Sequence, residues 1–207
     1  MVAGAVLASA VASTEAPERK VQDNIIMSAR DPELRIGLPK SVRYVGADRW
    51  ILYGIADCEL HGFVDVDPNG KVERIYWVQF EGYTPEKPEL KYEYTSPRRV
   101  AIGDMEFILD TGTRVKDEKA RAGSDREHLN ALIAAKGYKL PDGMIWARFV
   151  HLLDATKRRE LMIIYAEDVA PTGFTANDLR ENGKAREQWP AIESGMIERA
   201  KERIEVR

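Results

Sequence analysis

Residues 50–66, WILYGIADCELHGFVDV, decide the fold that this sequence predicts. Every even-numbered position in this stretch is apolar or glycine, whereas the odd-numbered positions mix apolar and ionisable side chains. Alternation with a period of two is typical of a β-strand that packs one face on a core. Because strands usually run about 5–6 residues, the stretch predicts one strongly curved strand or two collinear strands. Gly54 and Gly62 would allow the bend.

A tight turn is expected directly after this stretch, at Asp67-Pro-Asn-Gly70. Proline fixes φ, and asparagine and glycine accept the positive φ that a short hairpin requires. The chain would then run back antiparallel to residues 50–66. Pairing Val66 with Lys71 would set Leu60 opposite Trp77, and a bulge in the turn would change this register.

Downstream of this hairpin, the pattern predicts further strands and then helices. The clearest helix is 124–136, where Ser124 and Glu127 form a capping box and Gly137 supplies the stop. The other expected elements are strands at 90–95, 99–102 and 105–111, a hairpin of 144–153 with 160–169, and helices at 176–181 and from Pro190 onward. We therefore expect an α+β fold with a strongly curved antiparallel sheet of six to eight strands, a half-barrel or open barrel. A central helix and C-terminal helices would pack on it.

The composition is that of a globular protein with one main domain. The chain has 207 residues, 44 % of them hydrophobic and 31 % charged, with a net charge of −3. We expect an N-terminal arm at 1–40 and a single α+β domain at 41–207, with a helical C-terminal segment at 175–207. The near balance of charges argues against a nucleic-acid partner. No apolar run reaches the roughly 20 residues that span a membrane.

The first thirteen residues, MVAGAVLASAVAS, form an uncharged, small-residue segment that resembles part of an export signal. It holds two A-x-A cleavage patterns, but no basic residue precedes them. Two alternatives stand: an export signal, or an arm packed on its own or a neighbouring subunit. We expect a cytoplasmic protein, with a periplasmic or secreted location as the alternative if 1–13 belongs to a signal.

Motifs for several well-defined chemistries are absent from the sequence. Cys58 is the single cysteine, which excludes an intramolecular disulfide and a multi-cysteine zinc site. There is no G-x-G, P-loop, G-x-S-x-G or H-E-x-x-H pattern. Residues 65–70 match the first half of an EF-hand loop, but Tyr76 stands where that loop needs a glutamate. We therefore expect no cofactor and no bound metal.

Candidate catalytic residues lie on the mixed face of the 50–66 stretch and in a later strand. His61 and Glu59 are two residues apart, a spacing that places both on one strand face, where they could serve acid–base chemistry. Tyr76 would lie opposite His61 in the expected register. His151 is the second candidate histidine, although a histidine in an apolar strand is more often a hydrogen-bonded core residue.

Candidate ligand-binding residues are polar or aromatic side chains within apolar strands. Arg148 lies between apolar neighbours and must find a carboxylate or an anionic ligand, because an unpaired buried charge is costly. A curved sheet that turned these residues inward would form a ligand-binding cup. The predicted set is Arg148, Tyr165, Gln79, Glu81 and Trp77.

Three functions remain open. The leading hypothesis is a protein that binds a small molecule in a cleft on the curved sheet. The first alternative is a cofactor-independent hydrolase, lyase or isomerase that uses a histidine–carboxylate pair. The second is a structural subunit of a homodimer.

Overall fold

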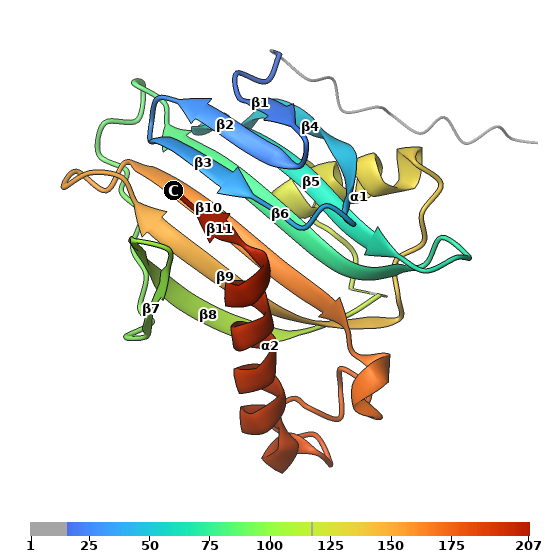
Figure 1. Cartoon of the computed structure of the whole chain (residues 1–207). Helices are drawn as coiled ribbons and strands as arrows, with labels where there is room; N and C mark the ends of the chain where they lie inside the picture. Colours follow the sequence, from blue (N-terminus) through green and yellow to red (C-terminus); the bar gives the residue numbers. More distant parts are fainter. Residues whose placement is uncertain (1–15, 117) are drawn as a thin grey trace, which may run out of the picture.

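The computed structural model describes residues 16–116 and 118–207. Within these ranges the chain forms two antiparallel β-sheets and two α-helices, which confirms the α+β class (Figure 1). The signal-like segment expected at 1–13 lies outside the described residues. Neither described helix is long and apolar enough to cross a lipid bilayer.

The larger sheet joins elements from the middle of the chain, and every neighbouring pair of strands is antiparallel. In the described chain its order begins with β4 and ends with β7, so the sheet is open rather than closed into a barrel. Its strands, in spatial order, are β4 (Arg43–Leu52), β5 (Ala56–Val66), β6 (Val72–Tyr83), β10 (Arg159–Asp168), β9 (Gly143–Leu152), β8 (Met105–Val115) and β7 (Arg99–Ile102).

The smaller sheet joins the two ends of the described chain. Its order is β1 (Lys20–Gln22), β2 (Ile25–Ala29), β3 (Glu33–Gly37) and β11 (Glu205–Val206). Residues 20–37, which belong to the N-terminal arm expected at 1–40, thus form three strands. The helices are α1 (Asp125–Ala135) and α2 (Trp189–Arg203), with single 3₁₀ turns at Ala170–Thr172 and Arg186–Gln188.

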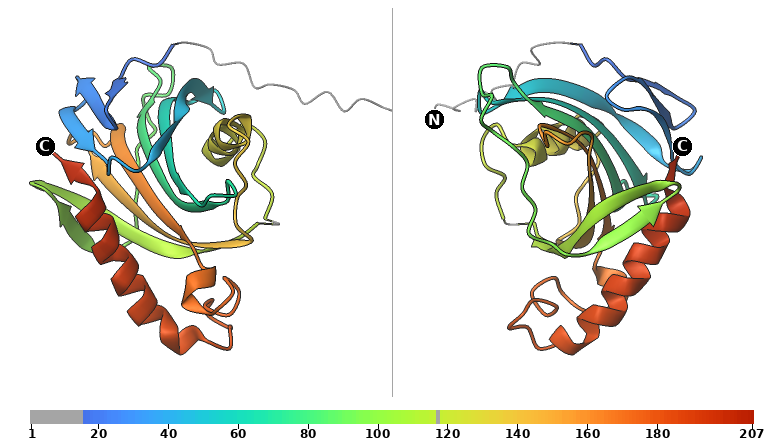
Figure 2. Two further views of the ribbon diagram at one scale, coloured as in Figure 1. Left: turned by 45° about the vertical axis from the view of Figure 1, so that its right-hand side comes forward. Right: turned by 90° about the vertical axis from the view of Figure 1, so that its left-hand side faces the viewer.

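The two faces of the larger sheet are covered by different elements. Figure 2 shows α1 on one side of the sheet, and the smaller sheet and α2 on the other side. We call these the α1 face and the α2 face. Leu129 and Ile133 of α1 belong to one core with Leu60 and Trp77, whereas Met196 of α2 belongs to a separate core on the opposite face. The central strands therefore carry a hydrophobic core on each side.

Residues 50–66 form a hairpin, which corrects the expectation of one curved strand or two collinear strands. β4 ends at Leu52, β5 begins at Ala56, and Trp50 pairs with Cys58. Tyr53 and Gly54 in the turn have φ angles of 48° and 74°. Because Leu52 pairs with Ala56, even-numbered positions stay on the same face in both strands. The alternation therefore passes through the turn without a break.

The hairpin of β5 and β6 has the expected faces but a different register. Gly62 pairs with Trp77, and Leu60 pairs with Gln79, an offset of two residues from the expected pairing. An irregularity between Asp65 and Val66 accompanies the turn, where Asp67 Oδ1 accepts the backbone N–H groups of Asn69 and Lys71. An even offset leaves each side chain on its expected face.

Two expected elements are absent from the described structure. Residues 84–98, which include the expected strand 90–95, form a loop between β6 and β7. Residues 176–181 form turns rather than a helix, although Thr175 Oγ1 does accept the N–H of Asp178 at 3.2 Å. The hairpin of β9 and β10 and the helix that begins near Pro190 are confirmed.

Helix α1 confirms the expected element, but its capping differs. Ser124 is the N-cap residue, yet its side chain makes no capping hydrogen bond. Glu127 Oε2 instead accepts the N–H of Gly123 at 2.6 Å. Gly137 has a φ of 74° directly after the helix, consistent with its expected role as the stop.

Candidate functional site

Alternation along the central strands decides which of the predicted ligand-binding residues share a face. Trp77, Gln79 and Glu81 of β6 lie on the α1 face, and Arg148 of β9 lines the same cavity as Trp77. Tyr165 of β10 instead belongs to the core on the α2 face. The structure therefore brings four of the five together and separates Tyr165 from them.

A cavity of about 390 Å³ lies on the α1 face, between the sheet and the beginning of α1. This volume is within the range of small-molecule sites, roughly 300–1,000 Å³. Apolar side chains form most of the wall, and charged groups stand among them. The lining residues are Ile75, Trp77, Thr113, Arg114, Glu118, Asp125, Arg126, Leu129, Met144, Trp146, Arg148, Met162, Ile164 and Ala166.

The wall of this cavity depends on a glycine in β8. Gly112 pairs with Trp146, and a Cβ atom added at Gly112 would lie 2.6 Å from Cζ2 of the indole. The indole can therefore lie against the β8 backbone only because residue 112 has no side chain. Gly112 thus leaves room for one of the two tryptophans that line the cavity.

A chain of hydrogen bonds extends from the cavity along the α1 face. Trp77 Nε1 donates to Gln79 Oε1 at 2.9 Å, and Gln79 Nε2 donates to Glu81 Oε2 at 2.7 Å. Two tyrosines of the 84–98 loop complete the network: Tyr92 donates to Glu81 at 2.8 Å, and Tyr94 donates to Glu160 at 2.7 Å. The polar side chains next to the cavity are therefore held in fixed positions.

Burial shifts the pKa values of the acids in this network upward. It raises the pKa of Glu160 to about 8, although the hydrogen bond from Tyr94 opposes the shift. Burial also raises the pKa of Glu81 and Asp125, and that of the Cys58 thiol. Loss of water disfavours the charged form of each group. At neutral pH Glu160 is therefore mainly protonated.

Three of these side chains have the spacing of metal ligands. The ligand atoms of Cys58, Glu81 and Asp125 all lie within 4.8 Å of one another. The thiol of Cys58 is fully buried. The raised pKa values favour the neutral forms, and these can share hydrogen bonds without a cation.

The loop with Tyr92 and Tyr94 is held by Arg158, which precedes β10. Its guanidinium donates to the carbonyl oxygens of Lys87 at 2.6 Å and Leu90 at 2.9 Å, and to that of Thr84 at 2.9 Å. Arg158 therefore holds the segment from which the two tyrosines reach the α1 face.

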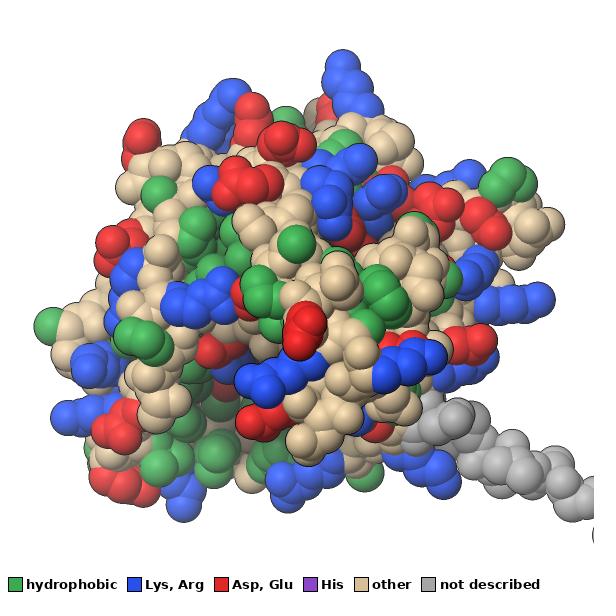
Figure 3. Space-filling model, turned by 90° about the horizontal axis from the view of Figure 1, so that it is seen from below, with side chains coloured by type: hydrophobic (Ala, Val, Ile, Leu, Met, Phe, Trp, Pro, Cys, Tyr) green, Lys and Arg blue, Asp and Glu red, His purple; other side chains and the backbone are tan. Residues whose placement is uncertain are grey.

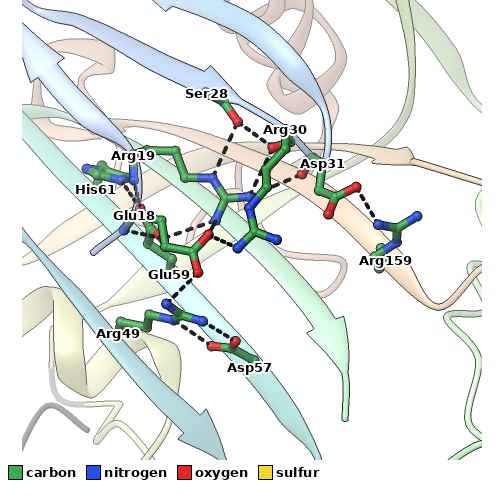
Figure 4. A network of polar contacts seen from close by, with 10 residues as sticks. All are labelled: Glu18, Arg19, Ser28, Arg30, Asp31, Arg49, Asp57, Glu59, His61 and Arg159. Carbon is green, nitrogen blue, oxygen red and sulfur yellow. Dashed lines mark hydrogen bonds and ion pairs between the residues drawn. The ribbon is translucent and has the colours of Figure 1, made fainter. Parts of the chain in front are cut away.

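Glu59 and His61 form a buried pair on the α2 side of β5, away from the cavity on the α1 face. His61 Nε2 lies 2.9 Å from Glu59 Oε1, and both side chains are at most 2 % exposed. Figure 4 shows that Arg19 reaches the same carboxylate. The backbone N–H groups of Glu18 and Arg19 donate to it at 2.9 and 2.7 Å, and Arg19 Nη1 donates at 3.0 Å. This arrangement favours a structural role for the pair, because N-terminal donors occupy the carboxylate.

The other candidate catalytic residues lie apart from this pair. Tyr76 is buried in the core of the α2 face, where its hydroxyl donates to Asp65 Oδ2 at 3.1 Å. His151 Nδ1 lies 2.8 Å from the carbonyl oxygen of Glu106 on β8. The four residues therefore do not form one site.

Two other hollows are less suited to a ligand. One of about 380 Å³ is lined by the charged network around Arg19 and Glu59. The other, of about 600 Å³, lies beside α2, where Arg199 binds Glu167 through two hydrogen bonds of 2.8 and 2.7 Å. In both, opposite charges already satisfy one another. On the face shown in Figure 3, positive and negative side chains are likewise interspersed.

Comparisons with known proteins give no further guide. Neither the protein-family models, nor the curated proteins, nor the solved structures gave a significant match to this chain. The candidate site therefore rests on the geometry of the cavity.

Arg114 and Arg126 are cavity residues that the sequence reading did not identify. Arg114 is near the end of β8, and Arg126 is in the first turn of α1. They are twelve positions apart on different elements, so no periodicity joins them. Alternation along β8 gives one indication for Arg114: its even-numbered position places it on the same strand face as Asp110 and Gly112.

Proposed function

We propose that this protein binds a small, mainly apolar molecule in the cavity on the α1 face. The observation that carries the proposal is the wall itself, in which Trp77 and Trp146 stand among methionine and aliphatic side chains. Burial of an apolar ligand against such a wall gains roughly 25 cal/mol for each Å² removed from water. Aromatic and apolar walls with a few fixed polar groups are the usual composition of ligand sites.

The polar groups at the cavity support binding rather than catalysis. Arg148 Nη2 donates to Asp110 Oδ2 at 2.5 Å, and its guanidinium lies 5.4 Å from the ring centre of Tyr94. Arg148 Nε is buried and has no hydrogen-bond partner among the described residues. A fixed donor of this kind would orient a ligand that carries one acceptor.

The test is the affinity for a neutral apolar probe, octan-1-ol, measured by isothermal titration calorimetry. Ala166 lines the cavity between Ile75 and Trp146, so Ala166→Phe would place an aromatic ring inside it. We expect this variant to bind octan-1-ol about tenfold more weakly or worse, because the added ring displaces the ligand. Ala134→Phe, an equal change at an exposed position of α1, should bind like the wild type. Absence of binding by the wild type, or equal binding by Ala166→Phe, would contradict the proposal.

A further inference from the structure

The described residues that line the cavity carry more positive than negative side chains. The lining holds three arginines, Arg114, Arg126 and Arg148, and two acids, Glu118 and Asp125. Arg148 is paired with Asp110, and Glu118 is paired with Arg180, so these two charges are already matched. Arg114 and Arg126 remain, with the single carboxylate of Asp125.

Neither of the remaining arginines is in an ion pair with a described residue. Arg114 Nη2 donates to the sulfur of Met144 at 3.3 Å, and a thioether is only a weak acceptor. Arg126 donates to the carbonyl oxygen of Lys119. Both arginines are half-buried, and both also line a smaller hollow next to the cavity.

Asp125 does not neutralise them. Its carboxylate lies within 4.8 Å of the ligand atoms of Glu81 and Cys58, and it forms no ion pair with either arginine. Its Oδ1 atom is buried without a hydrogen-bond partner in the described structure. The carboxylate of Asp125 therefore belongs with Cys58 and Glu81 on the α1 face.

Two unpaired guanidinium groups beside an apolar wall are costly unless an anion lies between them. Burial, and then the charge of Arg126, lower the pKa of Arg114 although the charge of Glu118 opposes the shift, which is consistent with this cost. The beginning of α1, where Arg126 stands, adds the positive end of a helix dipole. All three features favour negative charge at the same end of the cavity.

We infer that the ligand is an anionic amphiphile whose carboxylate is bound by Arg114 and Arg126 and whose apolar chain lies against Trp77 and Trp146. This inference rests on the proposed function, since it assigns the head group of a molecule held in the same cavity. A carboxylate can accept hydrogen bonds from both guanidinium groups, and such charge-assisted bonds are the stronger kind. The indole rings then cover the chain.

The experiment compares three probes of equal chain length: octanoate, octan-1-ol and octylammonium. Affinities are measured by calorimetry at neutral pH on the full chain and on the variants Arg114→Gln and Arg126→Gln. We expect the wild type to bind octanoate about tenfold more tightly than octan-1-ol. Each variant should lose that advantage and keep its affinity for octan-1-ol. Added salt should weaken the binding of octanoate alone.

Arg35→Gln is the matched control, because Arg35 is exposed on β3 and the variant has the same change in charge. It should keep the preference for octanoate.

Equal affinity of the wild type for octanoate and octan-1-ol would overturn the inference and leave the proposed function standing. A preference for octylammonium would also overturn it, because Asp125 would then dominate. Failure of the wild type to bind any of the three probes would overturn both proposals. The comparison of the three probes on the wild-type protein tests the inference even if a variant fails to fold.

Discussion

At the scale of single residues, Glu59 joins the N-terminal segment to the larger sheet. Although burial alone would raise the pKa of Glu59, hydrogen bonds from His61, Arg19 and Glu18 lower it to about 2. An unfolded glutamate has a pKa near 4.5. The folded state therefore gains stability from Glu59 above pH 4.5 and loses it as the pH falls toward 2.

We predict that Glu59→Gln lowers the free energy of unfolding at pH 7 by about 3 kcal/mol, because the charge that binds Arg19 is lost. The difference between variant and wild type should shrink at pH 3, where the unfolded wild type is already protonated at this position. Urea denaturation at both pH values measures it. Glu33→Gln, at an exposed position of β3, should change little. A Glu59→Gln protein as stable as the wild type at pH 7 would show that the network contributes nothing.

At the scale of elements, the sequence predicted the strand face on which a side chain lies better than it predicted where the elements begin and end. Period-two alternation placed Trp77, Gln79 and Glu81 together, and that part of the candidate site follows from local pattern alone. The strands around Tyr165 are apolar on both faces, so alternation gave no direction for its side chain. The 84–98 loop depends on Arg158, about seventy residues away in the sequence. Local pattern contains no signal for such a contact.

Docking of α1 on the sheet depends on Gly62 of β5. A Cβ atom added there would lie 2.8 Å from Leu129 Cδ1 and 2.8 Å from Val45 Cγ2. We predict that Gly62→Ala lowers the free energy of unfolding by about 1–3 kcal/mol, because α1 must move away from the strand. Gly195→Ala within α2 is the control and should be neutral or slightly stabilising, since alanine favours the helix and the nearest atom belongs to the flexible Arg199. Chemical denaturation of both variants decides the point: equal stability of Gly62→Ala and wild type would mean that α1 does not need this close approach.

At the scale of the whole molecule, one sheet carries two hydrophobic cores. The core of the α1 face contains Leu129, and the core of the α2 face contains Met196, each at most 1 % exposed. Strands β5, β6, β9 and β10 contribute side chains to both. Loss of packing on one face therefore loosens the strands that support the other, and the cavity on the α1 face depends on α2 through the sheet.

Because the two cores share strands, we predict that the protein unfolds in a single transition when a core side chain on either face is truncated. Leu129→Ala and Met196→Ala should each cost about 2–5 kcal/mol, the usual range for such truncations in a core. Because the strands are shared, far-UV circular dichroism and tryptophan fluorescence should report the same midpoint for each variant. Ile51→Ala truncates a side chain that is 43 % exposed and should leave the midpoint nearly unchanged. If Met196→Ala instead gave two separate transitions in circular dichroism, the earlier one with only the part of the fluorescence change that belongs to Trp189 of α2, the α2 face would unfold on its own. The cavity would then be independent of the elements that cover the far side of the sheet.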